Sequence, residues 1–153
     1  MQFFGQHTFP QPREAIFDFF TNLHNEPRWN PQLRHVELTS PGPVGRGTTW
    51  LLDYRQVGKM QVVTTEFERP ARVAWQVRSP KMDMEIRCRL EAGPGQGCTI
   101  RMEASVEPKG LMRLLGPFLK MMMARDFAAK GQQVQHAYEQ WERESAGIAL
   151  PGA

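Results

Sequence analysis

The polar side chains that could do chemistry are scattered along this sequence. Tyr54, Thr64, His35 and Asp53 are the candidates that could orient a carbonyl or hydroxyl group of a bound molecule. His35 stands alone, and a lone histidine is more often a surface residue than an acid or base. The sequence holds no GxSxG or HExxH motif, and the glycine-rich segment 93–97 lacks the Gly-Lys-Ser/Thr ending of a phosphate loop. No catalytic motif is present, so enzymatic activity is left open.

Metal and redox chemistry have no candidate residues either. The two cysteines, Cys88 and Cys98, form no CxxC motif and no cluster with histidine or carboxylate, so we expect no metal and no cofactor. Free thiols that act as small apolar residues are typical of a reducing compartment. This usage and an N-terminus without the pattern of an export signal favour a cytoplasmic protein.

Length and charge narrow the class of protein further. A chain of 153 residues is long enough for one domain with one core. The net charge is +3, but lysines and arginines never occur in runs longer than two, so we expect no nucleic-acid partner. Apolar runs are far shorter than the ~18 residues of a membrane span, so we expect no stable membrane insertion. The oligomeric state cannot be inferred.

The elements that must position these side chains follow from periodicity. Residues 2–9 form an extended segment, and Pro12 begins a helix whose apolar face includes Ile16, Phe19 and Phe20. Pro27 and Pro31 limit the next segment to a second, very short helix or turn. From residue 33 to 108 the period changes to two, with five turn signals, which predicts six consecutive antiparallel strands.

The clearest strand is 82–91, where apolar and charged residues alternate without exception, and segment 98–106 alternates in the same way. One register between them pairs Arg87 with Arg101 and Glu85 with Glu103. The other pairs Arg87 with Glu103 and leaves one like-charged pair, Arg89 with Arg101. We prefer the second because opposed like charges are unfavourable. Cys88 then faces Met102, too far from Cys98 for a disulfide.

The strand around residues 48–55 is best placed with Trp50, Leu52 and Tyr54 inward. A tight turn after it would pair Tyr54 with Met60. The following strand, 73–77, fits best against residues 63–67. The first pairing turns the even-numbered residues of the strand between them inward, whereas the second turns the odd-numbered residues inward. Either a bulge lies between positions 66 and 71 or Asp53 points inward, and the bulge is preferred because an unpaired buried carboxylate is costly.

One long helical pattern runs from residue 111 to about residue 143. Gly116 and Pro117 divide it into a short turn and a long helix that begins near Pro117. Gly131 lies on the apolar stripe of this helix, where it leaves room for close contact with the sheet, leaves room for part of a ligand, or is merely tolerated. Residues 145–153 show no period and are predicted to be a flexible tail.

This order of elements resembles the helix-grip fold of the START-like superfamily, which includes Bet v 1 allergens and polyketide cyclase/dehydratase-like (SRPBCC) proteins. The residues that carry the resemblance lie in five segments: 12–20, Arg28-Trp29-Asn30-Pro31, Gly45-Arg46-Gly47-Thr48, 66–75 and the terminal helix. It implies an α+β fold in which a seven-stranded curved antiparallel sheet grips the long helix. Residues 1–144 would form a single START-like ligand-binding domain, with an apolar cavity between sheet and helix.

The inward side chains of these elements are rich in methionine and aromatic residues, which suit a cavity for varied apolar molecules. The alternative is an ordinary filled core. The predicted cavity residues are Trp50, Leu52, Tyr54, Met60, Val62, Thr64, Trp75, Met84, Ile86, Cys88, Met102, Met122, Met123 and Phe127.

Three functions follow from these expectations. The first is binding of a small hydrophobic or aromatic molecule, such as a lipid, polyketide or quinone. The second is a cyclase/dehydratase-type enzyme, which would need two or more titratable groups converging in the cavity. The third is a protein-interaction module, which an exposed apolar patch at residues 111–123 would favour.

Overall fold

The structure is a computed structural model, and it describes residues 1–149. Its elements in chain order are β1 (Gln2–Phe9), α1 (Arg13–Thr21), the 3-10 helix η1 (Leu23–Arg28), β2 (Leu33–Leu38), β3 (Thr49–Tyr54), β4 (Gly58–Glu68), β5 (Arg72–Arg78), β6 (Met82–Ala92), β7 (Cys98–Pro108), the 3-10 helix η2 (Gly110–Leu115) and α2 (Gly116–Ala149).

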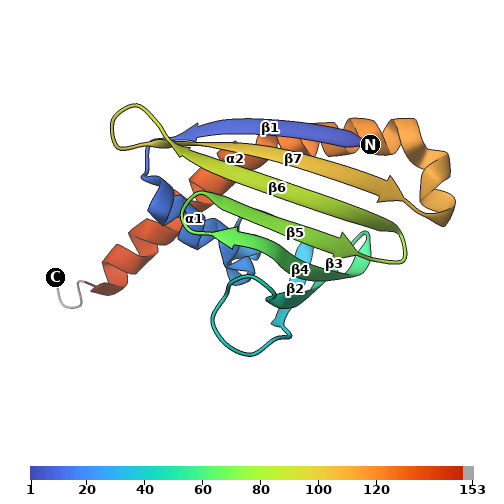
Figure 1. Cartoon of the computed structure of the whole chain (residues 1–153), viewed down its shortest axis with the longest axis horizontal. Helices are drawn as coiled ribbons and strands as arrows, with labels where there is room; N and C mark the ends of the chain where they lie inside the picture. Colours follow the sequence, from blue (N-terminus) through green and yellow to red (C-terminus); the bar gives the residue numbers. More distant parts are fainter. Residues whose placement is uncertain (150–153) are drawn as a thin grey trace.

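The seven strands form one antiparallel sheet in the order β1-β7-β6-β5-β4-β3-β2. The six consecutive strands β2 to β7 are neighbours in the sheet. The strand β1 pairs with β7 and forms one edge of the sheet, and β2 forms the other. The sheet is curved, and α2 runs along it on the side where α1 and η1 also lie (Figure 1). The expected α+β helix-grip architecture is confirmed.

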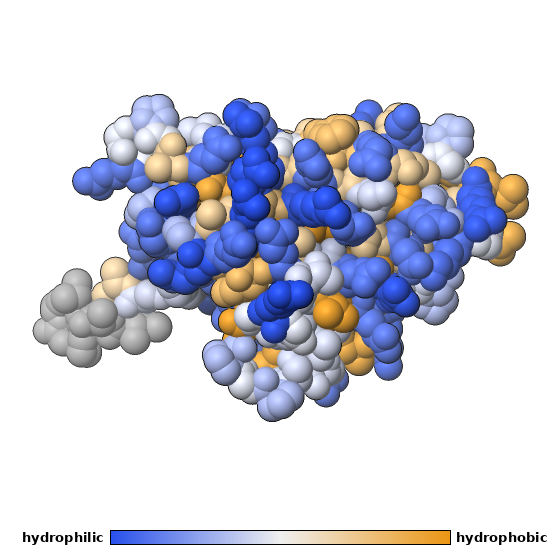
Figure 2. Space-filling model, viewed as in Figure 1, coloured by the Kyte–Doolittle hydropathy of each residue, from blue (hydrophilic) through white to orange (hydrophobic). Residues whose placement is uncertain are grey.

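The pairing of β6 with β7 follows the charge pattern. Arg87 faces Glu103, Arg89 faces Arg101 and Cys88 faces Met102, as predicted. Arg87, Arg89, Arg101 and Glu103 are exposed on the outer face of the sheet, while Cys88 is buried. Hydrophilic side chains accordingly cover much of the face seen in Figure 2.

The predicted pairing of β3 with β4 was wrong by two residues. Leu52 pairs with Met60, and Tyr54 pairs with Gly58 rather than with Met60. Residues 55–57 make the turn, and Gly58 has φ of 80°, a left-handed conformation that glycine adopts without steric cost. A shift of two residues keeps the same side chains inward, so Trp50 and Leu52 are buried as expected.

The bulge that resolves the parity conflict exists but lies earlier than predicted. The register between β4 and β5 shifts between Thr64 and Glu66, not between residues 66 and 71. Thr64 faces Trp75 before the shift, and Phe67 faces Val73 after it. Because the extra residue is at position 65, both Thr64 and Phe67 can turn toward the core.

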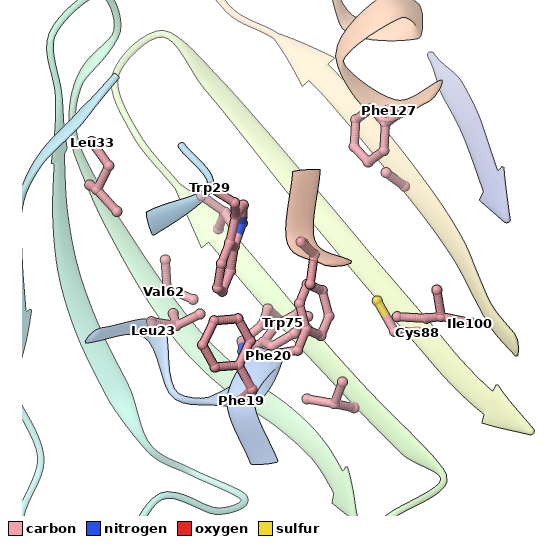
Figure 3. Packing of buried hydrophobic residues seen from close by; sticks show 14 of the residues in the cluster. Phe19, Phe20, Leu23, Trp29, Leu33, Val62, Trp75, Cys88, Ile100 and Phe127 are labelled. Carbon is pink, nitrogen blue, oxygen red and sulfur yellow. The ribbon is translucent and has the colours of Figure 1, made fainter. Parts of the chain in front are cut away.

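The core beneath the sheet is dominated by aromatic side chains from α1 and η1. Phe20 packs edge-on against Trp75 at a centroid distance of 5.4 Å, and Phe19 lies 5.4 Å from Trp29. These rings meet with Leu23 under the central strands (Figure 3). They hold η1 against the sheet, and this contact positions the polar residues of η1 described below.

The long helix α2 begins at Gly116, after the short turn η2, as the sequence predicted. It continues through Ala149, so residues 145–149 are helical and not part of a flexible tail. Segment 145–149 holds no proline, and a single glycine at position 147 is tolerated inside a helix. The rest of the predicted tail, residues 150–153, lies outside the described part of the chain.

Gly131 marks the closest approach of α2 to β1. A Cβ atom added at Gly131 would lie 2.2 Å from the His7 Cβ atom, and one added at Gly5 would lie 3.3 Å from the Phe127 carbonyl oxygen. Carbon atoms in contact are normally about 3.5–4.0 Å apart. Of the three roles considered for Gly131, close contact between helix and sheet is therefore the one it has.

Candidate functional site

A pocket of about 350 Å³ lies between the sheet, η1 and the first half of α2. This volume is within the range of ligand pockets, roughly 300–1,000 Å³. Its floor comes from strands β3 to β7, one wall from η1, and the opposite wall from residues 119–130 of α2. The interior is thus hollow at this point and not a filled core.

Most of the wall is apolar and methionine-rich. Eleven of the fourteen predicted cavity residues line the pocket: Leu52, Tyr54, Met60, Val62, Trp75, Met84, Ile86, Met102, Met122, Met123 and Phe127. Inward alternation brings the strand residues together, and steps of one and four place the three α2 residues on neighbouring positions of one helix face. A wall of this composition suits an apolar molecule of variable shape.

Three predicted cavity residues, Trp50, Thr64 and Cys88, do not line the pocket. Each faces inward as expected but lies in the packed core, and Trp50 is only 1% exposed. The His24 ring packs edge-on against the Trp50 ring at a centroid distance of 5.1 Å. Alternation identifies the face of a strand, but it does not identify the part of that face which the aromatic residues of α1 and η1 fill.

Two other polar candidates are also outside the pocket. His35 is exposed on β2. Asp53 pairs with Arg34 across the β2–β3 edge, with Nε to Oδ2 at 3.2 Å and Nη2 to Oδ1 at 3.4 Å. The carboxylate therefore has a partner at the surface and does not enter the core.

The polar centre of the pocket is Glu26 of η1. The Tyr54 hydroxyl donates to Glu26 Oε1 at 2.7 Å, and the Asn30 amide donates to the same oxygen at 3.2 Å. Both bonds end on Oε1, so the second oxygen, Oε2, is left for another donor. Burial raises the pKa of Glu26 above its ordinary value of 4.5, against the hydrogen bond from Tyr54. Burial and the neighbouring carboxylate also raise the pKa of Tyr54.

A second pair of charges faces this centre from α2. Lys130 Nζ lies 3.0 Å from Asp126 Oδ2, one helical turn away, and both residues line the pocket. The Lys130 side chain is 15% exposed, whereas that of Asp126 is largely open to solvent. The ammonium of Lys130 lowers the pKa of Glu26, so the two groups act on each other through the pocket. Two acids, a phenol and an amine thus converge in one apolar cavity.

Sequence reasoning found Tyr54 but missed Glu26, Asn30, Asp126 and Lys130. The segment around Glu26 has no period because Pro27 and Pro31 interrupt it, so nothing in the sequence marked this side chain as inward-facing. Lys130 did carry a signal, since it follows Phe127 by three positions and precedes Val134 by four on the apolar stripe. A lysine on an otherwise apolar helix face indicates a buried partner or a ligand.

Burial makes the thiols of both cysteines unreactive. Cys88 and Cys98 are free and buried, and burial raises the pKa of each thiol, to about 11 for Cys98. Within residues 1–149 no group of three or more histidine, cysteine or carboxylate side chains could hold a metal ion. No helix in this part of the chain has the length and apolar character of a membrane span.

Solved structures of low sequence identity share this fold. TTHA0849 from Thermus thermophilus matches with a TM-score of 0.73 at 11% identity, covering 92% of this chain and 98% of that one. Ara h 8.0201 matches with a TM-score of 0.65 at 18% identity, covering 92% and 96%. A START superfamily protein from Mycobacterium smegmatis matches with a TM-score of 0.64 at 16% identity, covering 92% and 98%.

No curated protein is significantly similar to this chain in sequence. A family model does match, over residues 4–138, and its description is polyketide cyclase / dehydrase and lipid transport. The matched region begins within β1, ends within α2 and includes every residue that lines the pocket. The chain therefore belongs to the polyketide cyclase / dehydrase and lipid transport family and has its START-like, Bet v 1-like fold.

Proposed function

We propose that the pocket binds a small, largely apolar molecule that carries one hydrogen-bonding group. The observation that carries this proposal is the pocket itself, about 350 Å³ of space with a mainly apolar wall and a polar centre at Glu26. Lipid, polyketide and quinone-type molecules have this character. The apolar part would contact the methionine-rich wall, while a hydroxyl would donate to Glu26 Oε2 or a carbonyl would accept from Lys130.

Titration with the neutral apolar fluorophore N-phenyl-1-naphthylamine tests this proposal. We expect saturable binding with one probe per chain and a rise in emission as the probe leaves water. Met102→Trp should lower the affinity more than about tenfold, because the larger ring occupies pocket volume. Met121→Trp is the matched control, since Met121 is exposed and outside the pocket. Unsaturable binding, or equal affinity in both variants, would refute the proposal.

A second function, cyclase/dehydratase-type catalysis, is favoured by the convergence of Glu26, Tyr54, Asp126 and Lys130 in one cavity. In a dehydration of a β-hydroxy carbonyl compound, Glu26 would take the proton from the carbon next to the carbonyl. Lys130 would protonate the departing hydroxyl, which leaves as water, and a carbon–carbon double bond forms. The raised pKa of Glu26 brings it closer to the range in which a carboxylate acts as a base near neutral pH.

Glu26→Gln separates the two functions because it keeps the shape of the side chain and removes the base. If the protein only binds, Glu26→Gln changes the affinity for a ligand that donates to Oε2, and neither the wild type nor the variant forms a product. If it catalyses dehydration of a β-hydroxy carbonyl compound, the absorbance of the conjugated product should appear about 10²–10⁴-fold more slowly. Wild-type protein without turnover on such compounds would argue for binding alone.

A further inference from the structure

Exposed apolar side chains gather at one end of the molecule. Six of the eight large hydrophobic residues exposed in the described chain lie in one stretch of twelve positions, and we call them the apolar tip: Leu111, Leu114, Leu115, Phe118, Met121 and Met122. Leu111 is 81% exposed and Leu114 is 79% exposed. The tip comprises η2 and the first turns of α2, at the right end of Figures 1 and 2. Such a concentration marks an interaction surface.

The charge around the tip has one sign. Residues 109–125 contain Lys109, Arg113, Lys120 and Arg125 and no acidic residue. Lys109 pairs with Asp83 at 2.8 Å, whereas the other three bases form no ion pair with any residue of the described chain. Arg125 follows Met121 by one turn, so it lies on the same helix face as the tip. The surface is therefore apolar with a positive rim.

The tip adjoins the wall of the pocket. Leu119, Met122 and Met123 line the pocket, and Met122 is also 43% exposed as a member of the tip. An apolar molecule that leaves the pocket along this wall would pass directly onto the tip. The same stretch of chain thus forms both the pocket wall and the exposed surface beside it.

We infer that the apolar tip docks on an anionic lipid bilayer, with the leucine, phenylalanine and methionine side chains inserted at the level of the headgroups. Arg113, Lys120 and Arg125 contact lipid phosphates, and the side of the pocket that Met122 lines faces the membrane. An apolar helix face with a basic rim is the pattern of an interfacial helix. Docking of this kind is independent of whether the pocket is filled.

Co-sedimentation with lipid vesicles tests this inference. Wild-type protein should bind vesicles of phosphatidylcholine mixed with phosphatidylglycerol, bind pure phosphatidylcholine vesicles weakly, and dissociate as salt is raised. Arg113→Gln, Lys120→Gln and Arg125→Gln should each weaken binding to the mixed vesicles about fivefold. Absence of wild-type binding to the mixed vesicles would overturn the inference.

A pair of charge-matched double variants isolates the tip. Leu111→Glu with Leu114→Glu should lower vesicle binding more than about tenfold. Phe4→Glu with Val63→Glu adds the same two negative charges at the remaining two exposed large hydrophobic positions and should lower binding much less. Thermal unfolding verifies that both variants are folded. Equal losses in the two variants would contradict docking through the tip. A wild-type dimer that the tip variant converts to a monomer would show that a second copy covers the tip, which also overturns the inference.

Discussion

Replacing Gly131 with alanine tests whether α2 is seated on β1 as the structure describes. The new Cβ atom would lie 2.2 Å from His7 Cβ and 2.5 Å from His7 Cγ. Rotation of the histidine side chain cannot move its Cβ, so the helix or the strand must shift by more than about 1 Å to reach ordinary contact. A shift of this kind disturbs the helix that forms one wall of the pocket.

The expected change combines two opposing effects. Overpacking of this kind costs about 1–3 kcal/mol, and so short a contact falls in the upper half of that range. Alanine regains up to about 1 kcal/mol of helix propensity over glycine. The net loss in the free energy of unfolding should therefore be about 1–2 kcal/mol, which lowers the melting temperature by roughly 2–8 °C for a chain of this size.

Urea unfolding followed by tryptophan fluorescence measures this change. Gly147→Ala is the matched control, because Gly147 lies in the same helix with nothing within 4 Å of an added Cβ, and this variant should be as stable as the wild type or slightly more so. In a His7→Gly background Gly131→Ala should lose its cost, which gives a coupling energy of at least about 1 kcal/mol. The reasoning fails if Gly131→Ala behaves like Gly147→Ala, or if the coupling energy is zero.

Three further predictions concern Glu26, the two cysteines and a structural metal. Because the pKa of Glu26 is raised in the folded state, the stability it contributes is complete below pH 4.5 and is lost as pH rises through the folded pKa. The free energy of unfolding of Glu26→Gln should thus increase relative to wild type above pH 4.5, and urea titrations that give a constant difference would contradict this. Native Cys88 and Cys98 should react with a disulfide reagent at pH 8 far more slowly than in urea, whereas equal rates would show that the thiols are accessible. A chelator should leave the melting temperature unchanged, and a marked fall would reveal a structural metal.

The sequence predicts the sheet well because strands with one solvent-exposed face alternate strictly between apolar and polar residues. Alternation in β6 and β7, together with the charges of Arg87 and Glu103, is sufficient to choose the register. The β3–β4 hairpin is harder, since a shift of two residues leaves every side chain on the same face, and the turn depends on the left-handed backbone of Gly58. The parity of the inward side chains predicts a bulge in β4, but no side chain marks its position at residue 65.

The candidate site is less predictable from the sequence than the sheet is. Its apolar wall follows from periodicity, but its polar centre joins η1, β3 and α2, which are distant in sequence. Glu26 is half-buried, and it meets Tyr54 and Lys130 only in the folded chain, across the pocket. Likewise, Thr64 is inward-facing yet lies in the packed core, because the rings of α1 and η1 fill that part of the sheet. These are properties of tertiary packing, which local patterns do not contain.

The central claim is that the pocket is where an apolar molecule binds, and methionine-methyl NMR tests it most directly. Six of the nine methionines line the pocket: Met60, Met82, Met84, Met102, Met122 and Met123. The other three, Met1, Met112 and Met121, do not. On titration with N-phenyl-1-naphthylamine we expect the methyl resonances of the pocket methionines to shift and saturate together at one probe per chain, while those of the other three stay nearly in place. Shifts confined to Met112 and Met121, or no saturable shift at the pocket methionines, would contradict the claim.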